Sequence, residues 1–252
     1  MSGTNPSCDA PDVQLSTTEL VQLTHRGCQI ARTSAEVLAA AIASGSGAAG
    51  AQIRSFEEEL DGLDRQINEG VTATIVRASE AEARELLACL KLIIELERIS
   101  DLLLNVSNRL ETVFGKLEAP DLVDLAAMAS IVSGMLGNVS DAFARRDLKT
   151  ALLILRADAE LDRLRNMIFI RHVDNPEREP RREGFHLVFM AQTLERAGDH
   201  AKNVAEEICH LVSGRSVRHI LRENDRPVEQ LFLERLRGAA RIKNGTSLEG
   251  KG

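Results

Sequence analysis

Acidic pairs at a recurring spacing are the residues of this sequence best suited to chemistry. The phrase Glu-Arg-x-x-Asp-x-x-x-Asn spans residues 97–105 and returns at 195–203, an offset of 98 residues. A further acidic pair lies upstream of each phrase, and these two pairs are offset by 101 residues. In every pair an acid precedes an aspartate by four residues, which places both carboxylates on one face of a helix. The four pairs are Glu57 with Asp61, Glu97 with Asp101, Asp158 with Asp162, and Glu195 with Asp199.

Carboxylates in this arrangement have the chemistry of a cation site. Like charges one helical turn apart destabilise an isolated helix by roughly 0.2–0.5 kcal/mol per pair, and a bound cation would offset that repulsion. Pairs from two neighbouring helices supply four oxygen donors and leave room for water. Because the repeated pattern holds no His or Cys, we expect a hard ion such as Fe, Mn, Mg or Ca rather than a structural zinc.

Plainer interpretations apply to the same residues. Acidic pairs on the outer face of an amphipathic helix are commonly just solvated, and the Arg of each phrase can form an i,i+3 ion pair with its Asp. Asn105 and Asn203 fall in mid-helix, where Asn is a poor helix former. They are therefore either ligands or interhelical hydrogen-bond partners, or they are incidental surface residues.

Long helices are needed to hold these residues, and the sequence indicates six. Apolar residues recur at helical spacing, and no sustained alternation indicates a strand. A Gly-Ser-Gly at 45–47, a proline at 120 and a polar stretch at 175–180 mark breaks. Gly214 is a candidate C-cap for the last helix. The predicted helices are 14–44, 50–77, 81–115, 119–144, 147–172 and 181–213, with a short one at 228–240 in a polar tail.

The phasing of the third and sixth helices separates a core face from an acidic face. Six apolar residues of the third helix follow a 4,3,4,3,4 rhythm and form one continuous stripe. Adding 98 to each number gives a second wholly apolar stripe. At about 100° per residue, the acids and Asn of each phrase lie opposite the stripe. The stripes are Leu92, Leu96, Ile99, Leu103, Val106 and Leu110, and Met190, Leu194, Ala197, Ala201, Val204 and Ile208.

Composition places the chain among helical proteins of two domains. A length of 252 residues allows one large domain or two of about 110 residues, and the repeat favours two. The absence of Trp and Tyr suits Leu- and Ala-rich bundles better than a β-sandwich. A formal charge of −7 argues against general nucleic-acid binding, which requires basic surface, and favours cations or basic partners.

Location is predicted from the cysteines and from the apolar runs. The four cysteines lack zinc-ligand spacing and are too sparse for a disulfide scaffold, so we expect reduced thiols in the cytosol. The polar N-terminus lacks the features of a signal peptide, and no apolar run approaches the roughly 18 residues of a membrane span. We therefore expect a soluble cytoplasmic protein without a membrane span, which partners could hold at the inner face of the membrane.

The second copy of the phrase resembles a signature of the PhoU family of phosphate-signalling accessory proteins. It reads Leu-Glu-Arg-Ala-Gly-Asp-His-Ala-Lys-Asn-Val-Ala-Glu-Glu at 194–207, with Gly214 and Val-Arg-His at 217–219 beyond it. The first copy, 96–105, resembles that family's other signature, and Arg84 occupies a position where the family often has an Arg. The resemblance covers about residues 12–222 and is specific, because several motifs occur in the right order.

This resemblance implies both a fold and a function. The implied fold is all-α, with two tandem three-helix, spectrin-like bundles related by pseudo-twofold symmetry at 12–116 and 117–222. Residues 1–11 would be a flexible N-terminus, and 223–252 a partly disordered C-terminal extension. The implied function is negative regulation of the phosphate regulon without catalysis. The implied partners are the ATPase of a phosphate ABC transporter and a phosphate-sensing histidine kinase, and the protein is expected to be a homodimer.

The resemblance also implies which residues bind metal on an acidic surface. The family's acidic motifs fall on all four pairs, but position 100 is Ser where the family often has Gly. Asn108 stands where the second half has Glu206, so we expect metal to be held less securely in the first half. The predicted cofactors are divalent or trivalent ions, with Fe, Mn, Mg or Zn as candidates. The predicted ligands are Glu57, Asp61, Glu97, Asp101, Asp158, Asp162, Glu195, Asp199, Asn203 and Glu206.

Two alternative functions remain at this stage. One is a PhoU-domain regulator of a sodium-phosphate cotransporter. The other is a ferritin-like di-metal enzyme, because Glu207 and His210 form a Glu-x-x-His motif. That fold needs two such motifs and two further Glu in one four-helix core, and the first half offers no counterpart. A surface His near a helix C-terminus, where the helix dipole favours it, is the simpler account of His210.

Overall fold

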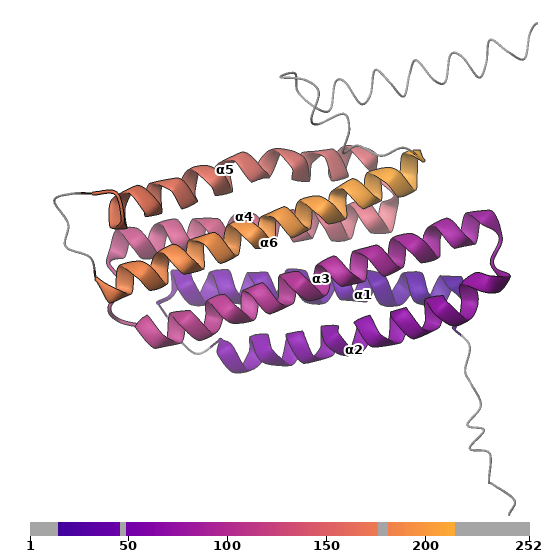
Figure 1. The fold of residues 1–252 in the computed structure, drawn as a ribbon, viewed down its shortest axis with the longest axis horizontal. Coiled ribbons are helices and arrows are strands. Elements are labelled where there is room, and N and C mark those ends of the chain that lie inside the picture. The colour runs from indigo at the N-terminus through magenta and orange to yellow at the C-terminus, as the bar shows by residue number, and fades with distance from the viewer. Residues whose placement is uncertain (1–14, 46–48, 176–180, 215–252) are drawn as a thin grey trace, which may run out of the picture.

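Six long α-helices make up the described part of the chain, which in this computed structural model comprises residues 15–45, 49–175 and 181–214 (Figure 1). No strand occurs in these residues, so the predicted all-α class is confirmed. The predicted helix bounds differ from the observed ones by no more than three residues. The elements are α1 (Thr17–Ala43), α2 (Gly50–Thr74), the 3-10 turn η1 (Ile75–Arg77), α3 (Glu80–Val113), α4 (Ala119–Arg145), α5 (Leu148–His172) and α6 (Arg182–Ser213).

Local hydrogen bonds explain where several helices begin and end. Ser16 forms a capping box with Glu19 at the start of α1, and Ser79 does the same with Glu82 at the start of α3. Each box satisfies backbone N–H groups that the first helical turn leaves without partners. Gly214 caps the end of α6 with φ +68°, as predicted, in a left-handed conformation that glycine adopts without steric cost.

The helices form two bundles of three that pack against each other. Within each half, every helix contacts the other two. Between the halves, α1 packs on α4 and α3 packs on α6, so helices at equivalent positions meet. This pairing agrees with the predicted pseudo-twofold relation of the bundles. It leaves α2 and α5 at the two outer edges, with α3 and α6 side by side between them (Figure 1).

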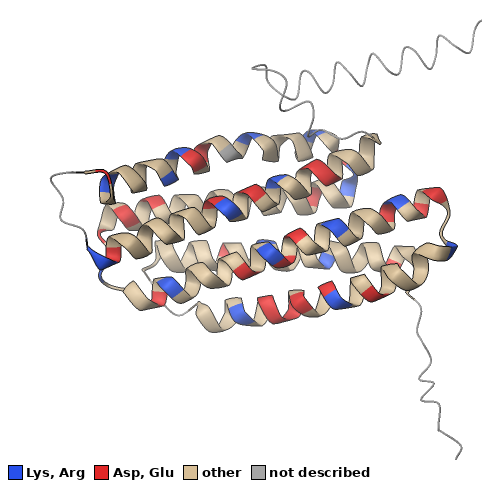
Figure 2. Cartoon of the chain, viewed as in Figure 1, with Lys and Arg blue, Asp and Glu red and all other residues tan. Residues whose placement is uncertain are grey.

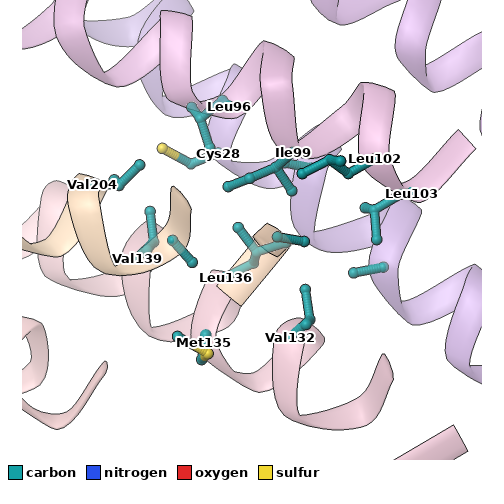
Figure 3. Close-up of a cluster of buried hydrophobic side chains, with 14 of the residues drawn as sticks. Cys28, Leu96, Ile99, Leu102, Leu103, Val132, Met135, Leu136, Val139 and Val204 are labelled. Carbon is teal, nitrogen blue, oxygen red and sulfur yellow. The ribbon is translucent and has the colours of Figure 1, made fainter. Parts of the chain in front are cut away.

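A single apolar core runs through both bundles. Every residue of the two predicted stripes is buried in it. Figure 3 shows the part of the core between the two halves. Cys28 of α1 and Ile99 of α3 come from the first half, and Leu136 of α4 and Val204 of α6 come from the second. Because the apolar faces of α3 and α6 point into this shared core, their polar faces are turned outward.

The composition of helix α4 contradicts the expectation that no apolar run approaches the length of a membrane span. By length and composition alone it is long and apolar enough to span a membrane, with a mean hydropathy of 1.6 over its most apolar stretch. In the fold it contacts α1, α5 and α6, and its residues Leu125, Val132 and Leu136 are fully buried. The apolar character of α4 therefore serves packing in the centre of the molecule.

Some predictions concern residues outside the described part of the chain. These are the N-terminal segment 1–11, the extension 223–252 and the short helix at 228–240. The limits of the two repeats at 12, 116, 117 and 222 stay predictions.

Candidate functional site

The α2–α3 face brings the two acidic pairs of the first half together. All four side chains are at least partly exposed on the outward side of their helices, and acidic positions follow both helices in Figure 2. Burial raises the pKa of Glu57, and the negative charges of Asp101 on α3 and Asp61 on α2 raise it further. Charge repulsion therefore acts across the two helices, as the cation hypothesis requires.

Asp64 adds a fifth carboxylate that the sequence prediction missed. Burial raises the pKa of Glu97, and Asp101, Asp64 and Asp61 add to this in that order. Asp64 is itself half-buried, and its Oδ1 accepts a hydrogen bond from Nδ2 of Asn68 at 3.0 Å. Asp64 lies three residues after Asp61, about one helical turn along the same face. This spacing was the feature of the sequence that could have placed Asp64 in the cluster.

Arginines of the chain partly balance this cluster, because the charge of Arg54 acts to lower the pKa of Glu57 and that of Arg98 acts to lower the pKa of Glu97. Nη1 of Arg65 lies 2.9 Å from Oδ2 of Asp61, but both residues belong to α2 and the Arg65 side chain is 67% exposed. An exposed i,i+4 pair contributes only a few tenths of a kcal/mol. The α2–α3 acidic cluster, defined as Glu57, Asp61, Asp64, Glu97 and Asp101, therefore keeps a net negative charge.

In the second half an arginine stands between the equivalent acids. Arg165 of α5 places Nη2 2.9 Å from Oδ1 of Asp162 and Nε 4.0 Å from Oε1 of Glu195 on α6. Its side chain is 30% exposed, and the 101-residue offset makes it the counterpart of Asp64. The acids of the second half thus have an internal cation between them, whereas the equivalent position of the first half carries a further carboxylate. Asp199 is exposed, and the side chain of Asp158 lies outside the description.

Asn203 contacts α3 of the first half, and Glu206 is nearly buried. Nδ2 of Asn203 donates to Oε2 of Glu95 on α3 at 3.1 Å, and Nδ1 of His200 lies 2.7 Å from the same oxygen. Asn203 thus forms an interhelical hydrogen bond, which is one of the three alternatives left open by the sequence. Glu206 is only 9% exposed. This contact between the halves was missed, because nothing in the spacing of Glu95 pointed to it.

The acidic cluster fits a hard cation by its donors but does not enclose one. Among residues 15–45, 49–175 and 181–214, no three His, Cys, Asp or Glu side chains converge closely enough to hold a metal ion. Burial is the largest cause of the raised pKa of Glu57 and of Glu97, and the neighbouring carboxylates add to it.

A groove between α3 and α6 joins the two copies of the phrase. It has a volume of about 380 Å³ and is lined by Arg98, Asp101, Leu102, Asn105, Arg196 and His200. Nη1 of Arg98 lies 3.7 Å from Oε1 of Glu95. In the described part of the chain, neither arginine pairs with the Asp of its own phrase, so the i,i+3 pairs considered from sequence do not form.

Comparison with known proteins gives a consistent result. The PhoU domain family model matches residues 25–110 and 125–208. A phosphate-specific transport system accessory protein PhoU homolog of Pseudomonas aeruginosa is 31% identical over 174 residues, which make up 67% of this chain and 72% of that protein. A protein of the same name from Zymomonas mobilis is 34% identical over 180 residues, 69% of this chain and 76% of that protein.

Solved structures show the same fold. The crystal structure of PhoU from Pseudomonas aeruginosa aligns with a TM-score of 0.71 and 23% identity, covering 79% of this chain and 97% of that chain. That of the phosphate transport system regulatory protein PhoU from Streptococcus pneumoniae aligns with a TM-score of 0.63 and 20% identity, covering 79% and 96%. With a family match in each half and one acidic phrase on each bundle, this chain belongs to the PhoU family.

Proposed function

We propose that this protein is a non-catalytic regulator of phosphate homeostasis that represses the phosphate-starvation response. It acts in the cytoplasm as a homodimer, on the ATPase of a phosphate ABC transporter and on a phosphate-sensing histidine kinase. The observation that carries the proposal is the PhoU family match in both halves, supported by relatives that are named accessory proteins of the phosphate-specific transport system.

The α2–α3 acidic cluster supplies the second part of the proposal. Glu57, Asp61, Glu97 and Asp101, with Asp64 beside them, hold a divalent or trivalent cation on the outward face of the first bundle. The surroundings of Glu57 and Glu97 support this assignment, because burial and then the neighbouring carboxylates raise the pKa of both groups, and a bound cation would stabilise their charged forms. When bound, the cation supplies positive charge and fixes the carboxylates as part of a docking surface.

The contacts of Glu207 support a regulator over a di-metal enzyme. Nζ of Lys91 on α3 lies 2.9 Å from Oε2 of Glu207, so this carboxylate already has a cationic partner. The His210 side chain is 50% exposed near the C-terminal end of α6, which agrees with the surface role expected from sequence.

Deletion of the gene in the organism that carries it tests the regulatory proposal. Loss of a negative regulator should raise the transcripts of phosphate-starvation genes in phosphate-rich medium, and a plasmid copy of the gene should restore repression. Transcript levels are measured at matched growth phase in rich and depleted medium. Unchanged transcripts in both media would contradict the proposal. An effect confined to sodium-dependent phosphate uptake would favour the cotransporter regulator instead.

A further inference from the structure

The groove between α3 and α6 is lined by two arginines and a histidine. Arg98 comes from the first copy of the phrase and Arg196 from the second, at positions related by the 98-residue offset. The helices that carry them pack side by side across the interface of the two bundles. The pseudo-twofold relation therefore places two equivalent guanidinium groups on one groove.

Arg196 has an exposed guanidinium without a partner. Its side chain forms no hydrogen bond or ion pair with any residue that the structure describes, although Asp199 lies three residues further along α6. A guanidinium presents five N–H donors in a planar fork that matches two oxygens of a phosphate-like group. In a groove, such a group is available to a ligand from solution.

His200 and Arg98 line the groove together with Arg196. Both contact Glu95, whose carboxylate lies 2.7 Å from Nδ1 of His200 and 3.7 Å from Nη1 of Arg98. The contact through Nδ1 orients the imidazole and leaves Nε2 as its other polar atom. His200 lines the groove with its side chain 17% exposed. Glu95 thus holds two basic groups in place beside Arg196.

Asp101 is the one acidic residue in the lining of the groove. Asp101 interacts electrostatically with Glu57 and Glu97, and so belongs to the α2–α3 acidic cluster. Asn105 donates through Nδ2 to the backbone oxygen of Asp101 at 3.2 Å. Leu102 occupies the position in α3 that His200 has in α6. The positive charge of the groove is therefore concentrated at Arg98 and Arg196.

We infer that the α3–α6 groove binds a tetrahedral oxyanion, to which Arg196 and Arg98 donate hydrogen bonds from the two bundles. Bidentate hydrogen bonds from guanidinium groups are among the strongest that a protein offers to phosphate-type oxygens. Because one arginine comes from each half, a bound anion would tie the two bundles together at their interface.

This inference goes beyond the proposed function, because a regulator could act through its partners without binding an anion itself. Only the choice of inorganic phosphate as the first ligand to test rests on that function. Binding is measured on the purified protein, whereas regulation is measured in the host. A failure of one experiment is therefore distinguishable from a failure of the other.

Isothermal titration of the full-length protein with inorganic phosphate at pH 7 and low ionic strength tests the inference. We expect saturable binding that Arg196→Gln weakens by about tenfold or more, since a charge-assisted hydrogen bond contributes about 1.5–3 kcal/mol. Arg98→Gln should weaken it similarly, and Arg196→Lys should restore part of the affinity. The matched control is Arg163→Gln, because Arg163 is an exposed arginine of α5 paired with Glu160. Circular dichroism checks that each variant folds.

Parallel titrations identify the source of the oxyanion. Phosphate, sulfate, a phosphomonoester and chloride are compared at equal ionic strength. Tighter binding of free phosphate assigns the groove to the inorganic ion. Tighter binding of the monoester assigns it to a phosphorylated metabolite. Either result supports an oxyanion groove if both arginine variants lose the binding. Absence of saturable binding, equal heats from chloride, or unchanged affinity in Arg196→Gln would overturn the inference.

Discussion

Positions 64 and 165 are equivalent in the two halves, yet they carry opposite charges. Asp64 adds to the acidic cluster between α2 and α3 and raises the pKa of Glu97. Arg165 instead lies within 4.0 Å of carboxylate oxygens on both α5 and α6. The equivalent position therefore adds a negative charge between α2 and α3 but a positive charge between α5 and α6.

Replacing Asp64 by arginine should remove the dependence of the first half on added metal. The variant Asp64→Arg supplies the first half with the counter-charge found in the second, and we expect it to abolish stabilisation by added Mn²⁺ or Mg²⁺. In the wild type, a cation present at about 100 times its dissociation constant adds roughly 2.7 kcal/mol to the free energy of unfolding. Thermal unfolding in chelator and in excess metal measures the difference.

Asp162→Asn is the matched control for this exchange. It removes a carboxylate from the second half, where Arg165 is already the partner, so the metal-dependent shift should persist. Elemental analysis of both purified variants gives an independent measure of bound metal. A metal-dependent shift in Asp64→Arg equal to that of the wild type would rule out the first-half site.

At the scale of the helices, close approach of α5 and α6 depends on a residue without a side chain. A Cβ added to Gly198 would lie 2.3 Å from Cδ1 of Leu161, whose side chain is fully buried. The equivalent position in the first half is Ser100, which is 1% exposed and whose Oγ has no hydrogen-bond partner. The two interfaces are thus built from different side chains on the same helical geometry.

Gly198→Ala should destabilise the protein despite the better helix propensity of alanine. Overpacking a core costs about 1–3 kcal/mol, whereas replacing a helical glycine by alanine gains roughly 0.5–1 kcal/mol. We expect a net loss of about 1 kcal/mol in the free energy of unfolding, measured by urea denaturation. Gly134→Ala in α4 is the control, because no atom lies within 4 Å of its added Cβ, and it should stabilise the protein. Stabilisation by both substitutions would refute the packing argument.

At the scale of the whole molecule, the two bundles share a core and a polar contact that breaks their symmetry. Glu95 of α3 accepts from Asn203 and contacts His200 of α6, whereas the equivalent of Glu95 in the second half is Thr193. Burial acts to raise the pKa of Glu95, but the hydrogen bonds from His200 and Asn203 and the charges of His200 and Arg98 lower it overall.

The lowered pKa of Glu95 makes the association of the bundles sensitive to acid. When the pKa of a carboxylate is lower in the folded state than in the unfolded state, its charge stabilises the fold fully at pH values above the unfolded-state pKa, here 4.5. This stabilisation is lost as the pH falls through the folded-state pKa. Glu95→Gln should therefore lower the free energy of unfolding by about 1 kcal/mol at pH 7. The difference from wild type should shrink below pH 4.5, as measured by denaturation at a series of pH values.

Glu69→Gln controls for the general effect of removing a negative charge. Glu69 is exposed on α2 and forms no ion pair with another described residue, so this variant should match the wild type at both ends of the pH series. A constant difference between Glu95→Gln and wild type at all pH values would show that the carboxylate charge of Glu95 does not stabilise the interface.

The sequence by itself determined the helices, their core faces and the duplicated acidic pairs. Helix bounds and apolar stripes depend on spacings of three or four residues, which are visible along the chain. Only the tertiary structure decided which charges meet: Asp64 with the α3 acids, Arg165 with Glu195, and the two arginines of the phrase on one groove. These partners lie on different helices and, in the groove, 98 residues apart. Packing of the buried faces sets their distances, so local periodicity alone does not reveal them.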